Sequence, residues 1–173
     1  SKYWIEKGQY SDVIQLLSNT IVPVRERDLS VERKLLLGDA YFRLDSFDIS
    51  KWLFEEVYAT AQDSLLWAKA CNHLGSWYYL ESEFDTAYIY YQKAYRLYER
   101  KLGKQHTKTA QVLFNLGLLA GQRGDYYTSQ QNFREALRIY RLTLGELHPR
   151  TAEAYAALGG AYLNTDNIMK AIF

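Results

Sequence analysis

The chain has 173 residues, with 21 Lys or Arg against 20 Asp or Glu, so its formal net charge of +1 gives no sign of the basic surface of a general nucleic-acid binder. A single cysteine excludes an intrachain disulfide framework and fits a reducing compartment. No apolar run approaches the roughly 18 residues of a membrane span, and the first residues do not form a signal peptide. We therefore expect a cytoplasmic (intracellular) protein without membrane insertion and without direct nucleic-acid binding.

A leucine–glycine pair recurs along the chain and sets a repeating register. Gly38, Gly75, Gly117 and Gly159 are separated by 37, 42 and 42 residues, and each follows a leucine. With Gly117 numbered as position 8 of a repeat, position 17 holds Tyr10, Phe47, Phe84 and Tyr126, and position 24 holds Leu17, Phe54, Tyr91 and Phe133. Recurrence at a fixed period of this length is typical of a repeat array.

Each repeat reads as a helical hairpin. Positions 4, 7, 8 and 11 fall on one face of a first helix, and positions 17, 20, 24 and 27 fall on one face of a second. Small residues at positions 8 and 20 should let the two backbones approach closely, while large residues at 11, 17 and 24 fill the space beside them. Because one hairpin cannot bury both of its faces, each hairpin should stack on the next.

In chain order, the register predicts one array over 1–173, made of a partial repeat (1–27), three repeats (28–64, 65–107 and 108–149) and a partial repeat (150–173). The longer second helices are expected at Phe84–Lys101 and Tyr126–Thr143. The last repeat should turn after its first helix and begin a second helix at Asp166. Neither end carries a capping helix, so we expect a fragment of a longer array that exposes Trp4, Ile5 and Ile172.

The links between the later repeats carry signals for a helix end and a helix start. Gly103 and Gly145 each follow a leucine at the end of a second helix, where glycine can supply a left-handed C-terminal cap. His148 and Pro149 should begin the next helix, because proline is tolerated in a first turn. The equivalent His106 lacks the proline.

These columns resemble the tetratricopeptide repeat over the whole chain. The longer unit at Leu144–Ala152, which reads Leu-Gly-Glu-Leu-His-Pro-Arg-Thr-Ala, resembles the repeats of kinesin light chains and of the nephrocystin-like group. The chain departs from the family pattern at Lys34 and Cys71, where a large apolar residue is usual, and at Val13. The resemblance implies an all-α fold, a right-handed α-solenoid of stacked antiparallel helix pairs (the tetratricopeptide superhelix).

Candidate catalytic and metal-binding residues each have a simpler structural explanation. His106 and His148 are equivalent residues that could approach a shared metal, but no Cys, Asp or Glu recurs at a ligand spacing, and helix capping explains them better. Cys71 lies near His73, but its position points into the helix pair, where a thiol behaves as a small apolar residue. The glycines do not form a phosphate-binding loop. We therefore predict no enzyme, no catalytic residue, no metal and no cofactor.

The resemblance places a peptide-binding groove on the first helices, where positions 2, 5, 6, 9, 12 and 13 face the concave side of the array. Asn115 matches the position-6 asparagine with which kinesin-light-chain-like repeats hold a peptide backbone, although His73 and Ala157 interrupt that series. The candidate groove residues are Arg43, Lys69, Asn72, His73, Ser76, Tyr79, Gln111, Phe114, Asn115, Leu118 and Gln122. Their mixture of apolar side chains and amides suits an extended or helical peptide with hydrophobic anchors.

Three functions are open at this point. The first is a non-enzymatic protein–protein interaction module, or adaptor, that holds a peptide segment of a partner in its concave groove. The second is a structural scaffold subunit that self-associates through exposed array ends or packs within a multi-protein assembly. The third is a regulatory domain of a larger effector. Tyr88, Tyr90 and Tyr98 on a second helix either cover the edges of the stack or form a partner surface on the convex side.

Overall fold

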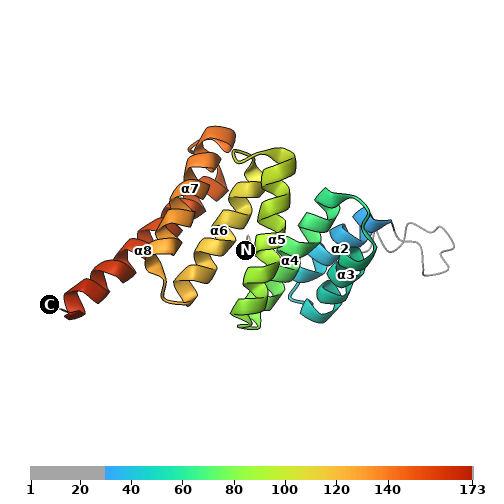
Figure 1. The fold of residues 1–173 in the computed structure, drawn as a ribbon, viewed down its shortest axis with the longest axis horizontal. Coiled ribbons are helices and arrows are strands. Elements are labelled where there is room, and N and C mark those ends of the chain that lie inside the picture. The colour runs from blue at the N-terminus through green and yellow to red at the C-terminus, as the bar shows by residue number, and fades with distance from the viewer. Residues whose placement is uncertain (1–29, 173) are drawn as a thin grey trace. The chain divides into compact units, whose positions relative to one another are not determined.

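The computed structural model describes the backbone of residues 30–172 and the side chains of residues 30–164. Its elements are all α-helices, which confirms the all-α fold class for the described part of the chain. Their bounds are α2 Val31–Arg43, α3 Phe47–Thr60, α4 Ser64–Leu80, α5 Phe84–Leu102, α6 Thr107–Gln122, α7 Tyr126–Leu144 and α8 Pro149–Ile172 (Figure 1). The predicted partial repeat 1–27, with Trp4 and Ile5, lies outside the described residues, as does the side chain of Ile172.

The chain divides into two compact units, Ser1–Trp77 and Tyr78–Phe173, with the division inside α4. In the first unit α2 packs against α3, and the ring of Phe54 covers Gly38. The ring of Tyr58 at the end of α3 stacks on Trp67 of α4 at a centroid distance of 5.0 Å. Aromatic residues on the second helix of the hairpin thus reach both its first helix and the helix that follows.

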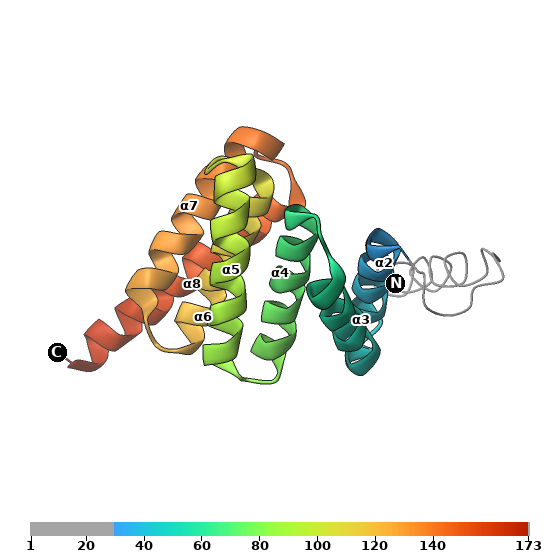
Figure 2. The same cartoon turned by 45° about the vertical axis from the view of Figure 1, so that its right-hand side comes forward.

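In the second unit, α5 packs on α6, α6 on α7, and α7 on α8 (Figure 2). The core contains Ala110 of α6, Ile139 and Tyr140 of α7, and Ala154 of α8, with Ala136 and Leu137 beside them. Gln130 on α7 is buried and donates a hydrogen bond from Nε2 to the carbonyl of Ala161, 3.3 Å away. Successive helices therefore pack in chain order, as a repeat array requires.

Three hairpins turn in the same way, through one residue with a positive φ at position 15 of the repeat. These residues are Asp45 (φ 61°), Ser82 (φ 62°) and Gly124 (φ 78°). The next N–H bonds back to the carbonyl of the residue at position 11 (Ser46 to Tyr41, Glu83 to Tyr78 and Asp125 to Ala120), each at 2.9 Å. With the accompanying bond from position 15 to position 12, this is a Schellman motif, which satisfies the last carbonyls of the first helix.

The turn expected before a second helix at Asp166 is wrong. Asp166 occupies position 15 of the last repeat, yet the backbone stays helical there and α8 continues to Ile172. In the complete hairpins, packing of the second helix against the first offsets the strain of a positive φ. Within the described residues, no helix that follows α8 packs back on it, so continuation of α8 is favoured locally.

The links α5–α6 and α7–α8 are fastened by a pair of equivalent side chains. His106 and His148 accept hydrogen bonds at Nδ1 from the N–H of Lys108 and Arg150, each at 3.1 Å, which confirms the capping interpretation. Thr109 and Thr151 donate from Oγ1 to the carbonyls of Gly103 and Gly145, at 2.9 and 2.8 Å. The two glycines have φ of 91° and 90° with ψ near 165°, a conformation open to glycine but not the left-handed helical cap that we expected.

Candidate functional site

A groove opens in the second unit between α6 and α8, over α7. We call it the α6–α8 groove; its pocket measures about 340 Å³. Its lining residues are Tyr79 from α4, Gly117, Leu118, Gly121 and Gln122 from α6, Tyr126, Ser129 and Phe133 from α7, and Ala157, Gly160, Ala161 and Asn164 from α8. The groove exists because α6 and α8 present glycine and alanine where larger side chains would fill the space.

The α6–α8 groove is lined without a single charged side chain. Leu118, Phe133 and Tyr79 supply its apolar surface, and the amides of Gln122 and Asn164 supply its polar groups. Ser129 is buried and already donates from Oγ to the carbonyl of Gly117 at 2.8 Å, so its hydroxyl proton is committed to the helix pair. This composition favours an uncharged, apolar ligand segment whose backbone can bond to the two amides.

Three of the predicted groove residues line this groove, namely Tyr79, Leu118 and Gln122. Phe114 instead packs against the core of the second unit and tilts over the ring of Phe133 at a centroid distance of 5.2 Å. Gln111 and Asn115 are half-buried and do not belong to the lining. Phe114 therefore acts mainly in packing, since it lies on the side of α6 that faces α7.

The first unit brings Arg43, Asp39 and His73 together from α2 and α4. Arg43 donates from Nε to Oδ2 of Asp39 at 3.3 Å, and Nδ1 of His73 lies 4.0 Å from Oδ1 of the same carboxylate. The His73 ring stacks on Phe54 at 4.4 Å, with 10° between the ring planes. His73 is therefore held by a ring on one side and faces a carboxylate on the other.

The remaining candidates of α4 differ in accessibility. Lys69 and Ser76 are half-buried, and the Ser76 hydroxyl donates to the carbonyl of Asn72 at 3.1 Å. Asn72 is only 5% exposed, so its amide is not open to a partner, contrary to our prediction. Asn72 sits beside Cys71 on the packed side of the helix, where Cys71 is fully buried.

Sequence reasoning missed the contribution of the second helices to the groove. Tyr126, Ser129 and Phe133 of α7 line it together with the first helices, although only the first helices were expected to bind. The repeat register indicated this arrangement, because positions 17, 20 and 24 lie on the face of the second helix that packs against position 8 of the first. Of the three tyrosines on α5 for which edge packing and a partner surface were both open, Tyr88 is exposed, Tyr90 stacks on Tyr78 at 5.3 Å, and Tyr98 is buried.

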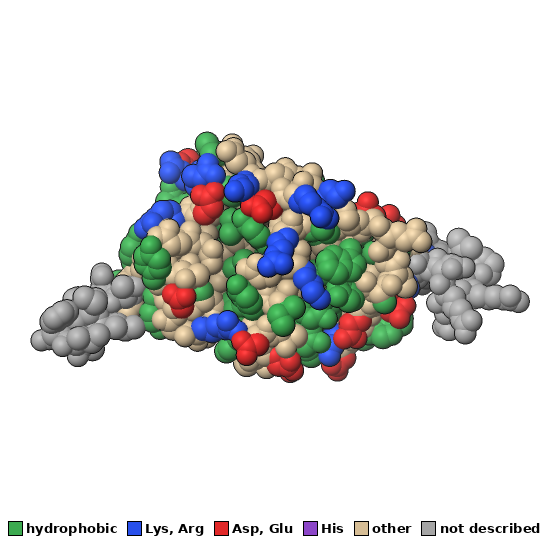
Figure 3. Space-filling view, in the orientation of Figure 1, with side chains coloured by type: hydrophobic (Ala, Val, Ile, Leu, Met, Phe, Trp, Pro, Cys, Tyr) green, Lys and Arg blue, Asp and Glu red, His purple; other side chains and the backbone are tan. Residues whose placement is uncertain are grey.

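The described surface offers neither a metal site nor a membrane span. Among the described residues, no three His, Cys, Asp or Glu side chains gather in a way that could hold a metal ion. In the same part of the chain, every helix is too short or too polar to cross a bilayer. Basic, acidic and hydrophobic side chains are intermixed on the face seen in Figure 3.

Comparison with known proteins finds similarity to one family of repeats. Residues 68–141 match the tetratricopeptide repeat family. No curated protein sequence matches the chain. Among solved structures, BtubC (BKLC) from P. vanneervenii superposes with a TM-score of 0.68 at 22% identity, covering 99% of this chain and 69% of that one.

Two further structures have the same fold. The kinesin light chain TPR-like repeats of Podosopora anserina give a TM-score of 0.66 at 16% identity, covering 95% of this chain and 82% of that one. PcrH from Pseudomonas aeruginosa gives 0.57 at 18% identity, covering 80% and 98%. At these identities the likeness shows the fold, a solenoid of stacked helix pairs.

Proposed function

We propose that this chain, which is a protein of tetratricopeptide repeats similar in fold to those of kinesin light chains, is a non-enzymatic interaction module that holds an apolar peptide segment of a partner protein. The proposal rests on one observation, the uncharged lining of the α6–α8 groove. An apolar side chain of the partner enters beside Leu118, and the amides of Gln122 and Asn164 bond to the partner's backbone. Most of the affinity comes from the buried apolar anchor.

The groove chemistry distinguishes this mode from recognition of an acidic terminus. Lys and Arg are the side chains that bind a carboxylate most strongly, and the α6–α8 groove has neither. Affinity that comes from apolar burial and neutral hydrogen bonds is only weakly screened by salt. We therefore expect partners of this groove to remain bound when the ionic strength is raised to about 0.5 M.

Neighbouring glycines on α8 provide a matched pair of variants. Within the described part of the chain, a Cβ at Gly159 or at Gly160 would meet no atom within 4 Å, so both positions accept a side chain, but only Gly160 lines the groove. Gly160→Leu should fill the groove and abolish capture of the partner, while Gly159→Leu should leave it intact. Affinity capture with the intact protein, read by mass spectrometry, compares the two. Equal retention or equal loss in both variants would contradict the proposal.

A second function, self-association, is favoured by the exposed apolar side chains of α8. Leu163 is 65% exposed, and Tyr155 and Tyr162 are also exposed. Another helix that packed there would bury them, as a neighbouring repeat does elsewhere in such an array. Sedimentation of Leu163→Glu against the unmodified chain tests this function: a shift from dimer to monomer supports it, and a concentration-independent monomer in both excludes it.

A further inference from the structure

A second groove lies between the second helices α5 and α7 and carries different chemistry. We call it the α5–α7 groove; its pocket measures about 490 Å³, within the range of ligand sites. It is lined by Tyr88, Gln92 and Tyr95 from α5, Leu113, Leu116, Leu119 and Ala120 from α6, the C-cap residue Arg123 of α6, the N-cap residue Asp125 of α7, and Thr128 and Asn132 from α7. It shares no lining residue with the α6–α8 groove.

The walls of the α5–α7 groove are polar and run at helical spacing. On α5, Tyr88, Gln92 and Tyr95 fall on one face, and on α7 Thr128 and Asn132 fall on one face. Neither Gln92 nor Asn132 makes a side-chain hydrogen bond within the part of the chain that the structure describes. An amide offers both donors and an acceptor, so the two walls can bond to both the N–H and C=O groups of an extended peptide.

The floor of this groove is apolar. Leu113, Leu116, Leu119 and Ala120 come from the side of α6 that lies between α5 and α7. Polar walls above an apolar floor suit a peptide that lays its backbone along the groove and points one apolar side chain downward.

One end of the groove carries a cation with a weak partner. The Arg123 guanidinium lies over the Tyr88 ring, 5.6 Å from its centroid, and is ion-paired with Asp85. The Asp85 side chain is 98% exposed, so water competes fully for this pair, and such pairs contribute little. The nearby Asp125 carboxylate is engaged as the cap of α7, where it accepts from the N–H of Thr128 at 3.0 Å.

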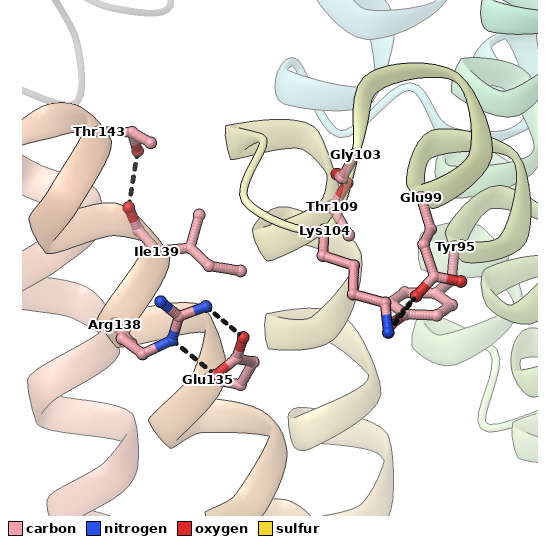
Figure 4. Close-up of polar contacts among 9 residues, drawn as sticks. All are labelled: Tyr95, Glu99, Gly103, Lys104, Thr109, Glu135, Arg138, Ile139 and Thr143. Carbon is pink, nitrogen blue, oxygen red and sulfur yellow. Dashed lines mark hydrogen bonds and ion pairs between the residues drawn. The ribbon is translucent and has the colours of Figure 1, made fainter.

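At the other end the charges are already paired with one another (Figure 4). Tyr95 donates to Glu99 at 3.0 Å, Lys104 lies 3.7 Å from Glu99, and Arg138 bonds to Glu135 at 2.7 Å. Each carboxylate there has its own cation. Arg123, at the opposite end, is therefore the lining residue that can bind a negatively charged group of a ligand.

We propose that the α5–α7 groove binds a short extended peptide of a partner protein in which an apolar residue is followed by an aspartate or glutamate. The apolar side chain rests on the α6 floor, Gln92 and Asn132 hold the backbone, and Arg123 exchanges Asp85 for the carboxylate of the ligand. This surface acts independently of the α6–α8 groove, and unlike that groove it is sensitive to salt.

The test is a titration of the intact ¹⁵N-labelled protein with a blocked Gly-Gly-Leu-Asp-Gly peptide and its Leu-Asn counterpart, followed by NMR. The Leu-Asp peptide should shift the side-chain amide signals of Gln92 and Asn132 and bind about tenfold more tightly than the Leu-Asn peptide. Arg123→Gln should remove that difference. Arg96→Gln, at an exposed site of α5 outside the groove, should retain it.

A second variant tests the same proposal if Arg123→Gln perturbs the fold. Asp85→Asn frees Arg123, so affinity for the Leu-Asp peptide should rise about two- to fivefold. Gly160→Leu, which fills the other groove, should change nothing in this titration. Three outcomes overturn the proposal: no shift at Gln92 and Asn132, equal binding of the two peptides, or shifts confined to the α6–α8 groove.

Discussion

The ring of Phe133 occupies the space that a side chain on Gly117 would need. A Cβ on Gly117 would lie 2.7 Å from Cδ1 of Phe133, and in the first unit a Cβ on Gly38 would lie 2.5 Å from Cε1 of Phe54. Glycine at position 8 and an aromatic residue at position 24 are therefore one packing unit. Our prediction that small residues bring the backbones together is sharpened, because glycine here makes room for a specific ring.

Gly117→Ala should destabilise the chain. The new methyl group collides with a buried ring, which typically costs about 1–3 kcal/mol and outweighs the helix-propensity gain of about 1 kcal/mol. Gly159→Ala is the matched control, because Gly159 stands at the same register position with no described atom within 4 Å of its Cβ, and this change should stabilise the chain by about 0.5–1 kcal/mol. Urea unfolding followed by circular dichroism measures the change in unfolding free energy for both variants. Changes of the same sign in both would contradict the proposed packing of Gly117 against Phe133. Phe133→Leu should relieve part of the Gly117→Ala penalty.

His148→Ala should destabilise α8. The imidazole Nδ1 satisfies a backbone N–H in the first turn, and loss of such a cap costs about 0.5–2 kcal/mol. His148→Asn, which can also accept this bond, should restore most of the stability. Hydrogen exchange of the first-turn amides of α8 checks the effect locally, and unchanged protection in His148→Ala would show that the histidine does not act as a cap.

Tyr140 should make the fold sensitive to alkali. Burial raises the pKa of Tyr140 from its usual 10.0 to about 12, and the Arg150 guanidinium only partly opposes this shift. As the pH rises, Tyr140 ionises in the unfolded chain before it ionises in the folded chain. Its contribution to the free energy of unfolding is therefore present in full below pH 10, and about 3 kcal/mol of it is lost as the pH rises from about 10 to 12. Unfolding free energies at several alkaline pH values should fall less steeply in Tyr140→Phe; parallel curves would contradict the assignment.

Asp125 and Glu135 should act in the opposite direction, at acid pH. Hydrogen bonds with Thr128 lower the pKa of Asp125, and the bond from Arg138 lowers the pKa of Glu135. Their contributions to the free energy of unfolding are present above the pKa values of the unfolded chain, which are about 4. These contributions are lost as the pH falls through the lowered pKa values of the folded chain. Both side chains are largely solvated, so the effect is small. Asp125→Asn combined with Glu135→Gln should flatten the acid limb of a stability–pH curve, and an unchanged limb would count against these pairs.

Much of the fold follows from the sequence because the repeat register encodes it. Gly117 and Phe133 are aligned with Gly38 and Phe54, and each pair meets in the structure. His148 and Pro149 begin α8 where the sequence indicates, since capping depends on only a few neighbouring residues. The turn at Asp166 could not be predicted from the register, because it depends on whether a second helix packs there.

The candidate site was predicted less completely. Tyr79, Leu118 and Gln122 lie in the lining of the α6–α8 groove, whereas Phe114 turns toward the core and Asn72 is buried, and their role in binding stays a prediction. A helix position fixes only the direction in which a side chain leaves the helix, and the sizes of its neighbours decide what remains accessible. The α5–α7 groove was not foreseen because it depends on the spacing of two helices from different repeats.

The glycines of the α6–α8 groove determine how the proposed binding mode would change its ligand. Gly121 and Gly160 both line the groove, and a methyl group at Gly160 would touch no atom of the residues that the structure describes. A single-residue change there alters the depth of the groove while the packing beneath it stays as it is. Under the proposed function, substitutions at Gly160 would therefore select ligands by shape without a cost to the packing of the helices.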